Sequence, residues 1–244
     1  MQDRPVLSNE APSANKPRTS RPRRRHRWRW IAAGALTLIV VAVAGTGLAV
    51  TLTPEPAPLA LPKGAAAPAG PLDGTWQVTG GSVAGFRVRE TVIGFSNDLT
   101  GRTSDVAGTL ALTGTQVTRA VFRVNLDAIA VNGKTRQPQL VRSLAMATDP
   151  DATVTLTQPL PLSPAFSTGA VVSLTTPATL TLHGITRPVT VTLSAQRNGS
   201  AIEAAGSLPV SFQDFGIAGP AGYGAFGSLA SNGTAEFLLV FRLS

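Results

Sequence analysis

Two arms of alternating apolar and hydroxyl-bearing residues flank a short turn in the second half of the chain. In the first arm Leu180 and Leu182 alternate with threonines, and in the second arm apolar residues and threonines alternate over residues 189–193. A period of two predicts β-strands with one dry face and one wet face, as in an antiparallel sheet. Gly184 can adopt a positive φ between the arms, and Pro188 costs no ladder hydrogen bond where the chain leaves a turn. The stretch therefore predicts a β-hairpin.

The same alternation predicts further strands across the second two-thirds of the chain. The expected strands, including the two of the hairpin, cover residues 75–78, 82–91, 105–112, 117–127, 152–157, 170–182, 189–196, 202–210 and 234–243. Residues 93–104 are turn-rich, so no strand is predicted there. Residues 138–146 begin with Pro, lack alternation and are predicted to form one short helix. About nine strands with so little helix indicate an all-β fold, either a closed antiparallel barrel or a sandwich.

Charge is concentrated at the start of the chain. The first thirty residues hold nine of the 21 Lys and Arg residues and only two of the 13 acidic residues, so nearly all of the net charge of +8 lies there. This segment is also rich in Pro and Ser and has no apolar period, which predicts a disordered tail over residues 1–29. The globular part of the chain is almost neutral.

A long uncharged run follows the basic tail and predicts a transmembrane helix over residues 30–52. The run itself covers residues 31–52, and a helix of that length spans about 33 Å, enough to cross a hydrocarbon core. The preceding Arg cluster and the aromatic pair Trp28 and Trp30 match a cytoplasmic flank and an interfacial belt. A basic run with aromatic residues is also typical of nucleic-acid binding, but the apolar run beside it favours the membrane, so no nucleic acid is expected.

The apolar run is predicted to stay in the mature protein as an anchor. The apolar part of a secretory signal is typically about 7–15 residues, shorter than this run, although residues 42–44 offer a small-x-small cleavage pattern inside it. We therefore expect a single-pass protein of the cell membrane, with its N-terminus in the cytoplasm and its C-terminal domain outside. Residues 53–71 hold six Pro and six Ala, which predicts a semi-extended linker that holds the domain of residues 72–244 off the membrane.

Catalytic chemistry finds little support in the sequence. The chain has no Cys, and His183 is the only histidine outside the basic tail, so a Cys nucleophile or a His-rich metal site cannot be built. No Gly-x-Ser-x-Gly motif is present, and the Gly-rich residues 216–227 lack the Lys and the following helix of a phosphate cradle. We predict no enzyme activity, no catalytic residue, no metal and no cofactor, and we interpret His183 as a turn residue satisfied by hydrogen bonds.

The hairpin carries a ten-residue phrase, Leu-Thr-Leu-His-Gly-Ile-Thr-Arg-Pro-Val, that resembles the recurring phrase of the YceI-like family. Residues 150–157 and 207–217 resemble two further segments of that family, with Val154 in place of the usual aromatic. The motif residues are Leu180, Thr181, Leu182, His183, Gly184, Ile185, Thr186, Arg187 and Pro188. The resemblance implies an antiparallel lipocalin-like β-barrel in residues 72–244, of the kind associated with polyisoprenoid lipids in the bacterial envelope.

The apolar inward faces of the predicted strands either fill a solid core or line a cavity. An eight-stranded barrel is just wide enough for side chains or for one ligand, so the pattern alone favours a solid core. The resemblance favours a cavity, because only 5% of residues are aromatic and small side chains leave space. The residues predicted to contact a ligand are Phe86, Val88, Phe122, Val124, Leu126, Val154, Leu156, Leu180, Leu182, Val191, Leu193, Phe237 and Leu239.

The expected function is therefore binding of an amphiphile. The resemblance implies an isoprenoid lipid or a quinone-like amphiphile, which the anchored barrel would sequester or carry outside the cytoplasm. The alternative is an envelope interaction or stress-response module with a solid barrel and no lipid. The sequence leaves the oligomeric state open, with a homodimer as one arrangement.

Overall fold

The computed structural model describes residues 56–92, 94–131, 134–135, 150–217 and 227–244. The basic tail, the predicted transmembrane helix and the predicted helix at residues 138–146 lie outside the described residues. Among those described, no helix has the length and apolar character needed to cross a membrane. The strands are Gly74–Val78 (β1), Val83–Val92 (β2), Phe95–Thr103 (β3), Val106–Thr113 (β4), Gln116–Asn125 (β5), Ala130–Val131 (β6), Lys134–Thr135 (β7), Asp151–Leu156 (β8), Leu160–Pro161 (β9), Val172–Leu182 (β10), Ile185–Asn198 (β11), Ala201–Ser211 (β12), Gly227–Leu229 (β13) and Asn232–Leu243 (β14).

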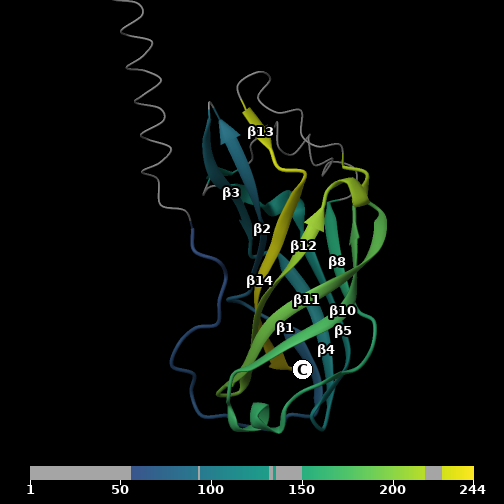
Figure 1. Cartoon of the computed structure of the whole chain (residues 1–244). Coiled ribbons are helices and arrows are strands. Elements are labelled where there is room, and N and C mark those ends of the chain that lie inside the picture. The colour runs from purple at the N-terminus through teal and green to yellow at the C-terminus, as the bar shows by residue number, and fades with distance from the viewer. Residues whose placement is uncertain (1–55, 93, 132–133, 136–149, 218–226) are drawn as a thin grey trace, which may run out of the picture. The chain divides into compact units, whose positions relative to one another are not determined.

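Eight of these strands close into an antiparallel barrel. They pair in the order β1-β4-β5-β8-β10-β11-β12-β14, and β14 pairs with β1 to complete the ring (Figure 1). Closure leaves no free edge around this ring, which distinguishes a barrel from an open sandwich. The prediction of an all-β antiparallel barrel is confirmed.

The hairpin of β2 and β3 extends the barrel wall beyond β1 and β4. Strand β2 pairs with β14 through Thr234 to Leu238, directly beyond the pairing of β14 with β1. Strand β3 pairs with β2 along its whole length, from Thr103 opposite Ala84 to Phe95 opposite Val92. The prediction that residues 93–104 form no strand was wrong, because the strand at Phe95–Thr103 carries few apolar residues and its polar sequence hides the period of two.

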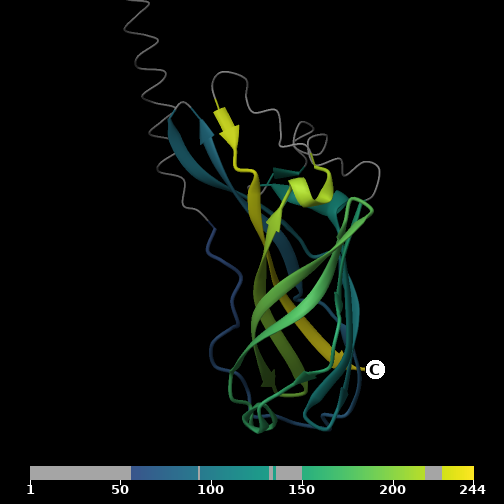
Figure 2. The same ribbon diagram turned by 45° about the vertical axis from the view of Figure 1, so that its right-hand side comes forward.

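The two ends of the barrel differ. At one end the short 3-10 segment Pro164–Thr168 (η2) inserts Phe166, which is 1% exposed, beside the equally buried Trp76. At the other end lie the turn between β10 and β11 and a second 3-10 segment, Gln213–Phe215 (η3) (Figure 2). We refer to these as the η2 end and the η3 end. A third 3-10 segment, Leu126–Ala128 (η1), follows β5.

Residues 56–70, which we call the strap, do not form a free spacer. They run along the outside of the barrel before the chain enters β1 (Figure 1). Arg87 of β2 donates to the carbonyl of Pro56 at 2.6 Å, and Arg197 of β11 donates to the carbonyl of Ala69 at 2.7 Å. The strap is therefore held to the barrel wall at both of its ends, although the boundary predicted at residue 71 stays a prediction.

Candidate ligand-binding cavity

The barrel encloses an apolar cavity of about 240 Å³. Inward-facing side chains from seven of the eight barrel strands, all except β1, contribute to its wall, because alternate residues of each strand point to the barrel axis. For comparison, an apolar cavity of roughly 150 Å³ stays dry and accepts a benzene molecule. The interior is thus not completely filled by side chains.

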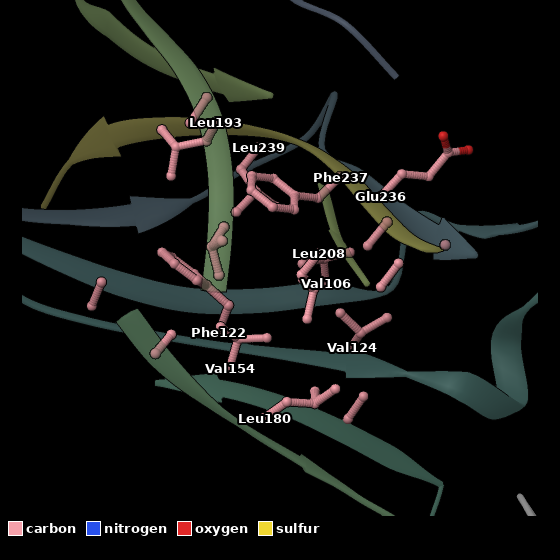
Figure 3. Close-up of a pocket in the computed structure, with 18 of the residues that line it drawn as sticks. Val106, Phe122, Val124, Val154, Leu180, Leu193, Leu208, Glu236, Phe237 and Leu239 are labelled. Atoms are coloured by element: carbon pink, nitrogen blue, oxygen red, sulfur yellow. The ribbon is translucent and has the colours of Figure 1, made fainter. Parts of the chain in front are cut away.

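All thirteen residues predicted to contact a ligand lie around this cavity. Phe122 of β5, Val154 of β8 and Leu180 of β10 point into the space that Leu193 and Phe237 face from the opposite wall (Figure 3). They meet there because each strand presents its apolar face to the barrel axis, as the alternation predicted. That these side chains contact a ligand stays a prediction.

The cavity wall also contains residues that the sequence prediction missed. Leu99 was missed because its strand, β3, was not predicted at all. Leu110 and Leu208 lie on predicted strands with the correct inward period, so the signal was present for both. Phe212 and Ile217 flank η3, outside any alternating segment, and only the folded chain brings them to the wall.

Few polar groups reach the interior. Thr176 of β10 is 4% exposed, and its hydroxyl lies at 3.4 Å from the carbonyl oxygen of Pro177. Glu236 belongs to the cavity wall through its backbone, but its carboxylate points outward (Figure 3). There it accepts a hydrogen bond from Arg102 at 2.9 Å. A charged ligand group inside this cavity would cost roughly several kcal/mol of binding free energy, because none of the described side chains of the wall points a pairing charge toward it.

The His183-Gly184 turn positions one rim of the cavity. The φ angles are +53° for His183 and +70° for Gly184, and a two-residue hairpin with positive φ at both positions is a type I′ turn. The ring nitrogen Nδ1 of His183 lies 3.2 Å from the carbonyl oxygen of Phe215. A carbonyl oxygen can only accept, so the ring donates. The prediction that His183 is a hydrogen-bonded turn residue agrees with this geometry.

Arg187, the eighth residue of the motif, makes a second contact to the same segment. Its Nε donates to the carbonyl oxygen of Asp214 at 2.9 Å. Two residues of the hairpin motif thus hold η3, whose Phe215 is 2% exposed, against the η3 end of the barrel. Through these two bonds the motif supports the cavity wall at the η3 end. Within the described residues, no three His, Cys, Asp or Glu side chains gather into a metal-binding group.

A closed eight-stranded antiparallel barrel around an apolar cavity is the lipocalin-like architecture, in which the barrel is wide enough to hold one small ligand. The chain belongs to the YceI-like family, because the family model described as "YceI-like domain" matches residues 76–240. The family resemblance of the hairpin motif is thereby confirmed.

One solved structure shares this fold at low sequence identity, and a second is reported with it for comparison only. A polyisoprenoid binding domain from Saccharophagus degradans, implicated in plant cell wall breakdown, is 18% identical with a TM-score of 0.54, and the match covers 70% of this chain and 98% of that one. BcnA of Burkholderia cenocepacia is 16% identical with a TM-score of 0.45, and the match covers 64% of this chain and 95% of that one. No curated protein matches the chain.

Proposed function

We propose that this protein binds the apolar chain of an isoprenoid lipid or quinone-like amphiphile inside the barrel, and that it carries or sequesters that molecule without chemical turnover. The observation that carries this proposal is the apolar cavity of about 240 Å³ within the barrel. Family membership and the polyisoprenoid-binding domain of the same fold support it.

The cavity suits a hydrocarbon chain better than a polar molecule. Each buried methylene-sized group contributes about 0.8 kcal/mol, so affinity would grow with the length of chain inserted. The wall offers the Thr176 hydroxyl but no inward-pointing charge among the described residues. A charged head group would therefore stay outside the cavity, and selectivity for it would come from groups at the rim.

Co-purification with a matched pair of variants tests the proposal. Val124 lines the cavity, whereas Val121 lies on the same strand with its side chain outside the cavity. Full-length protein and the variants Val124→Trp and Val121→Trp are purified in detergent, extracted with organic solvent and analysed by mass spectrometry. We expect wild type and Val121→Trp to yield an isoprenoid compound in similar amounts and Val124→Trp to yield several-fold less.

The outcome separates lipid binding from the alternative of an envelope interaction module. If all three proteins carry equal amounts, the compound comes from lipid around the anchor and the cavity proposal fails. If none of the proteins carries an isoprenoid and none binds one when it is offered, the lipid-binding proposal is refuted and the envelope interaction module is favoured. A Val124→Trp protein that unfolds would show a filled core, because overpacking costs about 1–3 kcal/mol.

The proposed location is the membrane, with residues 30–52 as the anchor and the barrel outside the cytoplasm. The supporting observation is the uncharged run of residues 31–52 directly after the Arg cluster. A reporter fused after Ser244 is expected to be active only outside the cytoplasm. Activity of a cytoplasm-only reporter would contradict this orientation, and a mature N-terminus near residue 45 would show secretion in place of anchoring.

A further inference from the structure

The strap has a fixed direction along the barrel. Its first residues lie beside β2 and β3, where Arg87 donates to Pro56 and Arg102 donates to the carbonyl of Ala57. The backbone nitrogen of Leu59 lies 3.4 Å from the carboxylate of Glu236. The upstream part of the strap is therefore bound at the level of the middle of β2 (Figure 1).

The last residues of the strap lie at the η2 end. Ala66 donates to the Asn198 side chain at 2.8 Å, and Gly199 donates back to the carbonyl of Ala66 at 3.1 Å. Ala69 then donates to the carbonyl of Gly199 at 2.9 Å. These bonds join the strap to the turn between β11 and β12.

A row of polar side chains lies beneath the strap on the outer face of the barrel. Gln196, Glu203 and Glu236 are only 4%, 6% and 5% exposed. Gln196 donates to Glu203 at 2.8 Å and lies 3.2 Å from the carbonyl of Pro62 in the strap. Outward-facing polar side chains on a barrel are ordinarily in water, so their burial indicates a covering segment that belongs in this place.

We infer that the strap orients the barrel on the membrane, with the η3 end facing the lipid surface and the η2 end facing away from it. This inference rests on the proposed anchor at residues 30–52. The anchor ends four residues before Pro56, the first strap residue bound to the barrel. Four residues of fully extended chain reach about 14 Å at most.

The length of β14 shows why the opposite orientation fails. Arg87, which holds Pro56, is level with Thr234, and β14 continues from there to Leu243 at the η2 end. Those nine residues cover about 30 Å of strand, or roughly 23 Å along the axis of a barrel tilted by about 40°. An upright barrel with its η2 end on the membrane would place Pro56 beyond the reach of the tether.

In the inferred orientation the cavity and the bilayer adjoin. Leu182 and Leu229, near the η3 end, belong to the cavity wall. Beyond Arg87, β2 extends by five residues to Val92, about 13 Å along the axis, which the tether can accommodate. An isoprenoid chain that enters the barrel at this end would then pass between the lipid surface and the cavity without crossing a wide layer of water.

Fluorescence quenching in vesicles tests the orientation. The chain has no Cys, so one Cys gives one labelling site. Thr186 at the η3 end and Ser167 in η2 are both exposed. Full-length Thr186→Cys and Ser167→Cys proteins carry an environment-sensitive dye and are reconstituted in phosphatidylcholine vesicles with a nitroxide-labelled head group. We expect at least twofold stronger quenching at position 186, and equal or reversed quenching would overturn the inference.

Two controls separate this inference from the proposals it uses. Flotation of the vesicles tests the anchor by itself, because a protein that does not float with them refutes the anchor and not the lipid cavity. A disulfide tests the strap by itself, because a Cβ on Gly199 would lie 3.9 Å from the Cβ of Ala66, within the range of roughly 3.5–4.5 Å for a disulfide. Oxidised Ala66→Cys/Gly199→Cys should crosslink.

The matched control for the crosslink is Ala66→Cys/Gly114→Cys. Gly114 has a φ of +59°, close to the +58° of Gly199, but a Cβ there would have nothing within 4 Å. Both pairs therefore carry the same backbone strain, and only the first should crosslink. Equal crosslinking of the two pairs, or no crosslinking in either, would show that the strap does not keep the described position. The inferred orientation would then be refuted, because it depends on that position.

Discussion

Glu236→Ala is expected to destabilise the barrel domain and release the upstream half of the strap. The Glu236 side chain is 5% exposed and lies 2.9 Å from Arg102 Nη2 and 3.7 Å from Arg87 Nη2. Gly85 lies directly between Glu236 and Arg102 in the register of the three strands. Because Gly85 carries no side chain, Arg102 can reach across β2 to the carboxylate.

The magnitude follows from the burial of the three side chains. Removing one partner of a fully buried ion pair costs about 3–5 kcal/mol, because the other charge stays buried and unpaired. The side chains of Arg87 and Arg102 are 17% and 30% exposed, so water reaches both in part. We therefore expect a loss of about 2–3 kcal/mol, equivalent to a fall in Tm of about 4–12 °C for a domain of this size.

Denaturant unfolding and limited trypsin digestion measure the two effects. Lys63 lies exposed in the strap, so faster cleavage after Lys63 in Glu236→Ala would report strap release. Glu236→Gln, which keeps an acceptor for Arg102 and Leu59, should lose only about 1 kcal/mol. The control is Glu90→Ala on β2, which removes a carboxylate outside these ion pairs. If Glu236→Ala lowers the free energy of unfolding no more than Glu90→Ala does, the buried Glu236 carboxylate does not stabilise the strap and the strands beneath it.

Three further substitutions test single backbone and turn positions. Gly184→Val should lower the free energy of unfolding by about 1–3 kcal/mol, measured by denaturant titration, because a β-branched residue is strained at a φ of +70°. His183→Ala should lower the free energy of unfolding by about 0.5–1.5 kcal/mol, because it removes the hydrogen bond to the Phe215 carbonyl, and should leave ligand binding intact. Loss of binding at an unchanged Tm would refute the structural role of His183. Gly85→Ala should cost about 1–3 kcal/mol, measured as a shift in Tm, because its Cβ would lie 1.9 Å from the Gly101 carbonyl oxygen.

The barrel could be predicted from the sequence because its physical cause is local. A strand that is dry on one face must alternate, and β5, β10 and β11 do so in the sequence itself. Strand β3 was not predicted, because pairing with the long strand β2 holds it in the sheet and its own composition does not indicate a strand. The choice between a filled and a hollow barrel needed the structure, since the same inward residues are consistent with both.

The strap could not be predicted because its partners are remote in the chain and its own groups are backbone atoms. Arg87 and Gln196 look like ordinary solvent-facing residues of alternating strands, Arg102 lies in a segment for which no strand was predicted, and nothing near them in the sequence indicates a covering segment. A sequence of Pro and Ala also has no hydrophobic period that would predict which face packs on the barrel. Its contacts use backbone carbonyls instead, and those of Pro56 and Pro62 accept hydrogen bonds from Arg87 and Gln196. Composition predicted a semi-extended linker and carried no information on the surface along which residues 56–70 lie.

The pairings of β14 have a consequence for how this domain folds. One strand joins β12 along one edge and both β1 and β2 along the other, and it brings Leu243 opposite Trp76. Contacts between residues so distant in sequence form slowly, since a large loop must close first. Until β14 arrives, β12 and β2 present unpaired edges, which are templates for aggregation. The emerging chain would therefore need protection from aggregation until β14 is available to pair.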